Sequence, residues 1–112
     1  QQNGTAVFSG NVLVGQGDMR LAAPRVLVVY AEDRGKIQRL EATGGVTLVS
    51  GPDAAEAERA DYNIDNGQVV LKGNVLLTQG QNAMTGNQLS VDLKTGTAQM
   101  GGRVKTILQP QE

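Results

Sequence analysis

The sequence contains no cysteine, no histidine and no tryptophan, and its only aromatic residues are Phe8, Tyr30 and Tyr62. Without cysteine there is no disulfide framework, and without Cys or His the usual tetrahedral zinc sites are excluded. The same absences remove the Cys–His and Ser–His pairs that activate nucleophiles in many hydrolases. Any function of the chain must therefore rest on aliphatic, hydroxyl, amide and simple charged side chains.

Long apolar runs and clustered charge are also missing. No stretch approaches the roughly 18 apolar residues of a membrane-spanning helix, and no basic segment followed by an apolar one indicates a signal peptide in this chain. Charged residues make up 19% of the 112 residues, the formal net charge is -1, and Lys and Arg are spread along the chain. A nucleic-acid partner is therefore excluded first. The length suits one domain, which we expect to span residues 1–112.

Glycine, in contrast, is abundant and separates short apolar runs. Gly10-Asn11-Val12, Gly44-Gly45-Val46, Gly73-Asn74-Val75 and Gly102-Arg103-Val104 follow one pattern, and their valines are spaced by 34, 29 and 29 residues. Repetition of this kind is typical of a periodic β protein. The pattern predicts strands at 5–9, 11–15, 18–22, 25–31, 36–42, 45–50, 56–65, 68–72, 74–79, 82–85, 87–94, 97–101 and 103–109. Residues 53–60 have high helix propensity but are too few for a stable helix, and we interpret them as a loop leading into a strand.

The side chains alternate along these segments. In Leu89-Ser90-Val91-Asp92-Leu93 the apolar residues share one face and the polar residues share the other. Extending this phase predicts an inward set: Phe8, Val12, Val14, Leu21, Val26, Val28, Leu40, Val46, Leu48, Tyr62, Ile64, Val69, Leu71, Val75, Leu77, Leu89, Val91, Leu93, Met100, Val104 and Leu108. Burial on one face implies either two antiparallel sheets facing each other or one sheet rolled on itself, and a jelly-roll-like arrangement is the one we expect.

Four runs resemble a known family. They are Phe-Ser-Gly-Asn-Val-Leu-Val at 8–14, Ala-Asp-Tyr-Asn-Ile-Asp at 60–65, Val-Val-Leu-Lys-Gly-Asn-Val at 69–75 and Met-Thr-Gly-Asn-Gln-Leu-Ser-Val-Asp-Leu at 84–93. In order and spacing they resemble the LptA/OstA-like family of lipopolysaccharide-transport proteins. The resemblance implies an all-β fold, an open, slightly twisted β-jelly roll of repeated short antiparallel strands. Only seven residues precede Phe8, where the family usually carries another strand, so we expect an N-terminal strand to be missing from this chain.

The resemblance also implies a function. The apolar interior of the family's fold holds the acyl chains of lipid A, and its protomers join head to tail through edge strands into a bridge across the periplasm. The implied partners are lipopolysaccharide, further copies of the chain, and OstA-domain proteins resembling LptC at the inner membrane and LptD at the outer membrane. No cofactor is implied. The implied location is the periplasm.

Specific residues follow from the inward phase and the resemblance together. Lipid contacts are predicted at Val12, Val14, Val28, Leu48, Tyr62, Ile64, Leu71, Val75, Leu77, Leu89 and Val91. Edge contacts between protomers are predicted at Phe8, Val104, Thr106, Ile107 and Leu108. Simple core packing explains an inward Val or Leu equally well, and the resemblance favours ligand contact most for Tyr62, Ile64 and Leu48.

Two other functions compete with lipid transport. Glu56 and Glu58 share one face of a predicted strand and suggest a carboxylate pair for glycoside chemistry, although exposed acids there are usually a solvated surface. We do not expect an enzyme. The stronger alternative is a structural polymerising β-scaffold without ligand, which would need a filled core, whereas a carrier needs inward side chains that leave a cleft.

Overall fold

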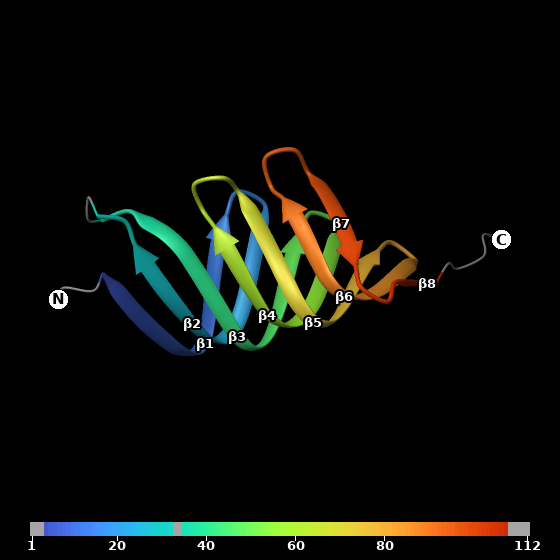
Figure 1. The fold of residues 1–112 in the computed structure, drawn as a ribbon, viewed down its shortest axis with the longest axis horizontal. Coiled ribbons are helices and arrows are strands. Elements are labelled where there is room, and N and C mark those ends of the chain that lie inside the picture. The colour runs from blue at the N-terminus through green and yellow to red at the C-terminus, as the bar shows by residue number, and fades with distance from the viewer. Residues whose placement is uncertain (1–3, 33–34, 108–112) are drawn as a thin grey trace.

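The computed structural model describes residues 4–32 and 35–107, and it consists of one antiparallel sheet (Figure 1). The strands are β1 (Thr5–Gln16), β2 (Met19–Tyr30), β3 (Ile37–Ser50), β4 (Asp53–Asn63), β5 (Gln68–Gln79), β6 (Asn82–Asp92), β7 (Thr97–Gly101) and β8 (Lys105–Ile107). Each strand from β1 to β6 pairs with the next strand in the sequence, and β8 pairs with the first part of β6. Of the two predicted arrangements, the sheet rolled on itself is the one observed.

The described residues form no α-helix, so this part of the chain contains no helical segment that could cross a membrane. The all-β, open, antiparallel fold predicted from the alternation of side chains is thereby confirmed. The molecule is elongated, with principal extents of 57 × 26 × 24 Å. The first and last strands therefore lie at opposite ends of the sheet (Figure 1).

A row of β-bulges crosses the sheet at one level. From β1 to β6, the register of every strand pair shifts there, because the odd-numbered strands carry one extra residue. The row reads Gly10-Asn11, Pro24, Gly44-Gly45, Glu58, Gly73-Asn74 and Asn87. Bulges bend a strand and increase its twist, and a row of them bends the whole sheet along a line. The row therefore folds the sheet into two facing leaves.

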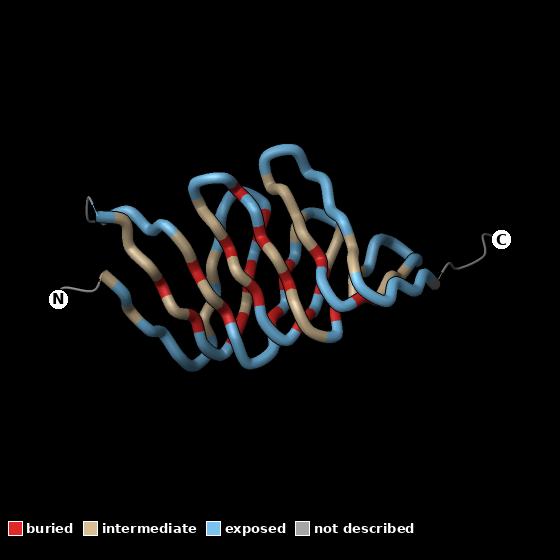
Figure 2. The backbone as a smooth tube through the Cα atoms, in the orientation of Figure 1, coloured by how far each residue is buried: buried red, intermediate tan, exposed pale blue. Residues whose placement is uncertain are grey.

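The two leaves are defined by their position relative to this row. Leaf A comprises residues 12–16, 19–23, 46–50, 53–57, 75–79, 82–86 and 105–107, and leaf B comprises 5–9, 25–30, 37–43, 59–63, 68–72, 88–92 and 97–101. Each of the strands β1 to β6 contributes one half to each leaf. Buried positions occur in both halves of the strands (Figure 2). The core is the aliphatic filling between the leaves, and Leu21, Leu71 and Val69 are among its least exposed members.

Short turns close the outer border of leaf A. The hairpins β1–β2, β3–β4 and β5–β6 each have a two-residue loop that begins with glycine, namely Gly17, Gly51 and Gly80. Their φ angles are 59°, 59° and 62°, and the residue after each glycine has a negative φ, as in a type II′ turn. Tight turns of this type fix the register of a hairpin. The alternating phase is thereby held within each of these three hairpins.

The strand boundaries differ from those expected. Most of the predicted short strands merge in pairs into strands of 11 to 14 residues, because the Gly-Asn and Gly-Gly joints are bulges inside a strand and do not end it. Residues 53–60 were interpreted as a loop leading into the strand predicted at 56–65. The strand is confirmed, but the loop before it is wrong, since β4 begins at Asp53. Ala55, Ala57 and Ala60 of β4 are buried between β3 and β5, and that burial outweighs their helix propensity.

The predicted inward set is confirmed except at its two ends. All of its described members except Phe8 and Val104 belong to the core or pack against it. Phe8 lies opposite the buried Val26, and so on the inner face, but its residue is 48% exposed because β1 is the outermost strand. Val104 is 44% exposed in the bend between β7 and β8. The last strand, predicted at 103–109, is described only as Lys105–Ile107, and Leu108 lies outside the described residues.

Candidate functional site

An apolar cleft of about 260 Å³ lies between the two leaves in the C-terminal half of the roll. Leaf A supplies Leu48, Ala55, Leu77 and Met84, and leaf B supplies Leu89, Val91, Ala98 and Met100. The full lining is Leu48, Ser50, Asp53, Ala54, Ala55, Leu77, Gln79, Met84, Leu89, Val91, Asp92, Leu93, Gly96, Ala98 and Met100. We call this cleft the groove.

The groove exists because small side chains occupy positions where bulkier ones would fill the core. Ala54 and Ala55 stand at its β4 wall, and Ala98 stands at its β7 wall. Nearer the N-terminus, the space between the leaves is filled by larger residues such as Leu21, Val26 and Leu40, which are 1–2% exposed. The interior is thus closely packed around Leu21, Val26 and Leu40, and it is less filled toward β7.

Met100 shapes the wall of the groove through a close approach to Gly86. A Cβ placed on Gly86 would lie only 2.6 Å from Met100 Cγ and 2.7 Å from its Sδ. Gly86 does not have a positive φ, so backbone conformation alone does not require glycine at this position. What glycine provides there is room for the thioether. Met84, two residues before Gly86 on the same strand, lines the groove beside it.

The rim of the groove is polar and carries carboxylates. Gln79 Nε2 donates a hydrogen bond to Asp53 Oδ2 at 3.3 Å, which links the start of β4 to the end of β5. Across the opening, Asp92 Oδ1 accepts hydrogen bonds from the backbone N–H groups of Lys94 at 2.9 Å and Thr95 at 3.3 Å. Among the residues that the structure describes, no lysine or arginine lines the groove. A groove with an apolar interior and a polar, partly acidic rim suits the alkyl part of an amphiphile.

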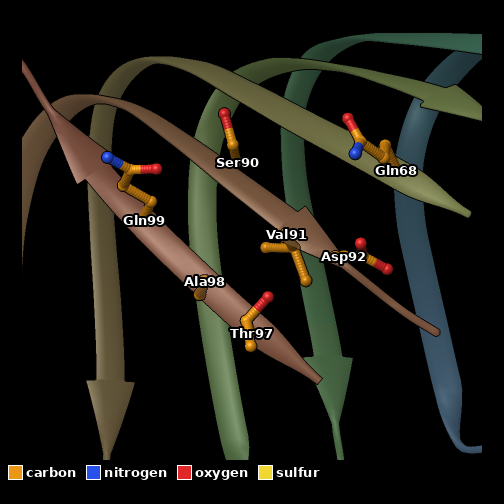
Figure 3. A pocket seen from close by; sticks show the side chains of 7 residues that line it. All are labelled: Gln68, Ser90, Val91, Asp92, Thr97, Ala98 and Gln99. Atoms are coloured by element: carbon orange, nitrogen blue, oxygen red, sulfur yellow. The ribbon is translucent and has the colours of Figure 1, made fainter. Parts of the chain in front are cut away.

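A second hollow, of about 370 Å³, lies on the outer face of the β6–β7 hairpin, and its lining is more polar than that of the groove (Figure 3). Its side chains form two cross-strand rows: Gln68, Asp92 and Thr97 in one, and Ser90 and Gln99 in the other. These positions alternate with the inward Leu89 and Val91, so the rows face outward. Although it is the larger hollow, its polar lining does not suit an alkyl chain. The groove is therefore the better candidate.

The predicted lipid contacts fall into two groups. Leu48, Leu77, Leu89 and Val91 line the groove together. The others lie apart from it: Val28, Tyr62, Leu71 and Val75 are buried in the packed core, and Val12, Val14 and Ile64 are partly buried against that core. For both groups, contact with lipid stays a prediction.

Tyr62 illustrates the packed part of the interior. It is 3% exposed on β4, opposite Leu40 of β3 and Val69 of β5. Burial raises the pKa of the Tyr62 phenol above its ordinary value of 10.0, because the ionised form would lose its hydration. Its cross-strand neighbours are aliphatic, so Tyr62 belongs to the packed core and not to the groove wall. Ile64 lies in the β4–β5 turn, outside β4.

Several groove residues were absent from the predicted site. Ala55, Met84, Leu93, Ala98 and Met100 line the groove and were not proposed as contacts. Leu93 and Met100 belonged to the predicted inward set, so the signal for these two was present. The alanines could have been found by applying the same alternation to small residues, because Ala98 lies opposite Val91.

The predicted oligomer residues lie at the two ends of the sheet. Phe8 belongs to β1, whereas Thr106 and Ile107 belong to β8, and Val104 precedes β8. Among the described residues, the strand order gives β1 and β7 only one neighbouring strand each. The structure therefore places these residues where a sheet could be extended.

The two carboxylates considered for glycoside chemistry lie in different surroundings on β4. Glu58 lies in the bulge row, where its Oε2 accepts a hydrogen bond from Asn74 Nδ2 at 2.5 Å. Glu56 is exposed and lies before the register shift, opposite Thr47 and Leu76. Within residues 4–32 and 35–107, no group of three or more acidic side chains is arranged to hold a metal ion.

Comparison with known proteins places this geometry in context. The chain is 40% identical to an uncharacterized protein of Rhizobium meliloti (strain 1021), over 95% of this chain and 63% of that protein. It thus spans less than two thirds of the length of this relative. A crystal structure of LptH from Pseudomonas aeruginosa, described as the LptA-homologous periplasmic component of the lipopolysaccharide transport device, superposes with a TM-score of 0.85. That likeness covers 97% of this chain and 87% of LptH at 20% identity, and it shows a shared fold.

A family model provides the assignment. The model described as LptA/(LptD N-terminal domain) LPS transport protein matches residues 1–97, which include β1 to β6 and the apolar core between them. The match confirms the resemblance found in the four sequence runs. The chain belongs to the LptA/LptD N-terminal domain family of lipopolysaccharide-transport proteins.

Proposed function

We propose that this protein is a periplasmic carrier that binds the acyl chains of lipopolysaccharide in the groove and passes them along a bridge from the inner to the outer membrane. Membership of a lipopolysaccharide-transport family supports the ligand class. The observation that carries the proposal is the apolar cleft between the leaves, which a filled scaffold would lack. The protein acts by binding and not by catalysis.

The size of the groove suggests how binding proceeds. The groove volume of about 260 Å³ lies just below the range of ordinary ligand sites, which begins near 300 Å³, so several acyl chains do not fit into the groove as it stands. The leaves are joined along the bulge row and separate most easily at the opposite border, where the turns lie. Lipid therefore enters by spreading the leaves at that border.

The groove also suits transfer from one carrier to the next. Burying one methylene group stabilises a complex by about 0.8 kcal/mol. Burial of an alkyl chain of about a dozen carbons therefore contributes roughly 10 kcal/mol, and each successive carrier must provide a similar binding free energy. The lining offers aliphatic and thioether surface, and none of the charged side chains in the described part of the chain is buried. A chain can slide along such a surface without breaking specific contacts.

Binding is tested with the purified chain and purified lipopolysaccharide, measured by displacement of a fluorescent alkyl probe. We expect saturable binding with competition by lipopolysaccharide and by detergents with alkyl tails of about twelve carbons. Delipidated oligosaccharide should not compete, because it lacks the part that enters the groove. Absence of probe binding by the folded chain would favour the polymerising scaffold without ligand.

Assembly is the second part of the proposal. β1 at one end and the β7–β8 border at the other expose backbone N–H and C=O groups that can pair with another copy. Pairing of two different edges is heterologous, so it produces open filaments and not closed dimers. Such joining would align the grooves of successive copies. Phe8, on the inner face of β1 and half exposed, would gain cover from the added strand.

Removal of residues 103–112 is expected to weaken self-association while most of the groove wall remains. Of the predicted edge residues, the deletion removes the four in the C-terminal segment, including Thr106 and Ile107 of β8. Light scattering over a range of concentrations should show growth for the full chain and little growth for the truncated one. A sharp dimer that grows no further, or equal growth of both chains, would contradict head-to-tail joining.

The family assignment suggests the remaining partners. An LptC-like protein at the inner membrane would load the first copy, and an LptD-like protein at the outer membrane would receive lipid from the last. Both would use the same edge pairing, because their OstA-like domains present comparable strands. Cross-linking between β1 and the last strand of such a partner would test this arrangement.

A further inference from the structure

The groove holds two of the three methionines of the chain. Met84 and Met100 both line it and both are partly exposed. Met19 lies in the core near the other end of the sheet and is 2% exposed. The sequence has no cysteine, tryptophan or histidine, so its most readily oxidised accessible side chains are these two thioethers.

We propose that Met84 and Met100 form an oxidation site, modified by peroxides, that closes the groove to alkyl chains. The closing effect rests on the proposed function, whereas the selectivity for these two residues stands on the structure alone. Methionine at a binding surface is an adaptable apolar contact, and its conversion to sulfoxide makes that contact polar.

The reaction balances with hydrogen peroxide as the only co-reactant. A lone pair on the Met sulfur attacks one peroxide oxygen, the O–O bond breaks, and an S–O bond forms. Sulfur is oxidised by two electrons, and the departing hydroxide takes up the proton of the transferred oxygen to leave as water. The product is the sulfoxide, which methionine sulfoxide reductases can return to the thioether.

Two features of the structure make the product incompatible with an alkyl ligand. The sulfoxide oxygen is a strong acceptor, and Leu77 and Leu89, which pair with Met84 and Met100 across the sheet, offer it no side-chain donor. The third cross-strand partner, Thr106 of β8, lies beside Met84 only and is itself exposed to water. Met100 is also confined, because its sulfur fills the space left open by Gly86. An added oxygen has no room on that side, so the side chain turns into the groove.

Peptide mapping tests the selectivity directly. Cleavage after Lys and Arg places Met19, Met84 and Met100 on three separate peptides, residues 1–20, 73–94 and 95–103. During graded hydrogen peroxide treatment of the folded chain, we expect Met84 and Met100 to gain oxygen at least about tenfold faster than Met19. Equal rates at all three residues, with circular dichroism unchanged, would overturn the proposed site.

The effect on binding is measured with the fluorescent alkyl probe on the same samples. Oxidation should weaken probe binding by about fivefold or more, in line with burial of an unpaired polar group, and treatment with methionine sulfoxide reductases A and B should restore it. The affinity of the double variant Met84→Leu/Met100→Leu for the probe, whatever its starting value, should be the same before and after peroxide, and Met19→Leu should respond to peroxide as the unchanged chain does. Full binding by the oxidised chain, or peroxide sensitivity of the double variant, would overturn the closing effect.

The two proposals fail in different ways. If the untreated chain does not bind the probe, the proposed function and the closing effect are both overturned, while the peptide map still decides the selectivity of oxidation. If the untreated chain binds and the oxidised chain binds equally well, only the closing effect is overturned.

Discussion

Replacing Ala98 with arginine is expected to abolish alkyl-chain binding while the sheet remains folded. Ala98 lies on β7 opposite Val91, and its side chain faces the groove. Its residue is exposed in the unbound protein, so the longer side chain can be accommodated without disrupting the core. The substitution acts on the ligand more than on the fold.

The expected size of the effect follows from two costs. The arginine stem fills part of a groove of about 260 Å³, and an acyl chain placed beside the guanidinium would strip water from a charge that has no partner in the groove interior. We expect affinity for the alkyl probe to fall at least tenfold, equivalent to about 1.4 kcal/mol or more.

The neighbouring residue provides a matched control. Gln99 is the next residue on β7, and its side chain lies on the outer face opposite Ser90. Gln99→Arg adds the same charge to the same strand and should leave probe binding within about twofold. Equal loss of binding in both variants would indicate an effect of net charge or of the edge strand, and would remove the groove from the site. Circular dichroism and urea unfolding confirm that both variants fold.

The alternation of side chains predicted most of the inner face from sequence alone. Leu89, Val91 and Leu93 set the phase, and it held through β1 to β7 because two-residue turns and a bulge in nearly every strand pair keep the leaves in register. The same reasoning could not find where the interior is empty. The location of empty space depends on the volumes of the side chains that line the interior from both leaves, such as Ala55 and Ala98. The alternation of side chains carries no information on these volumes.

The bulges were the main feature that local sequence rules misread. Gly73-Asn74 has the composition of a hairpin turn, and Asn74 does adopt a positive φ of 46°. Pairing nevertheless continues on both sides, with Lys72 opposite Gln88 and Val75 opposite Gly86. Whether such a pair of residues ends a strand or bends it is decided by the neighbouring strands. A bulge and a strand end can be told apart here only in the structure, where the bulges from β1 to β6 lie at one level of the sheet.

Replacing Gly73 with alanine is expected to produce a large loss of stability. Gly73 lies in the bulge row on β5 with a φ of 89°, a conformation that costs a residue with a side chain roughly 1–3 kcal/mol. A Cβ there would also lie 2.4 Å from Glu58 Oε1 and 2.9 Å from Glu58 Cβ. The carboxylate can swing away, because Glu58 is exposed, but its Cβ moves only if β4 and β5 separate.

The variant Gly45→Ala separates the backbone strain from the contact with Glu58. Gly45 lies in the same bulge row on β3 with a φ of 101°, but a Cβ placed on it would have no atom within 4 Å. Both variants carry the backbone strain, and only Gly73→Ala also forces two central strands apart, at a further cost of about 1–3 kcal/mol. Urea unfolding should therefore show the free energy of unfolding lowered by about 4 kcal/mol for Gly73→Ala and by roughly half of that for Gly45→Ala. Equal losses would show that the contact with Glu58 contributes nothing. A loss below about 1 kcal/mol in Gly73→Ala would contradict the view that the bulge row, with its glycines at positive φ, holds the two leaves at their present angle and so keeps the groove open.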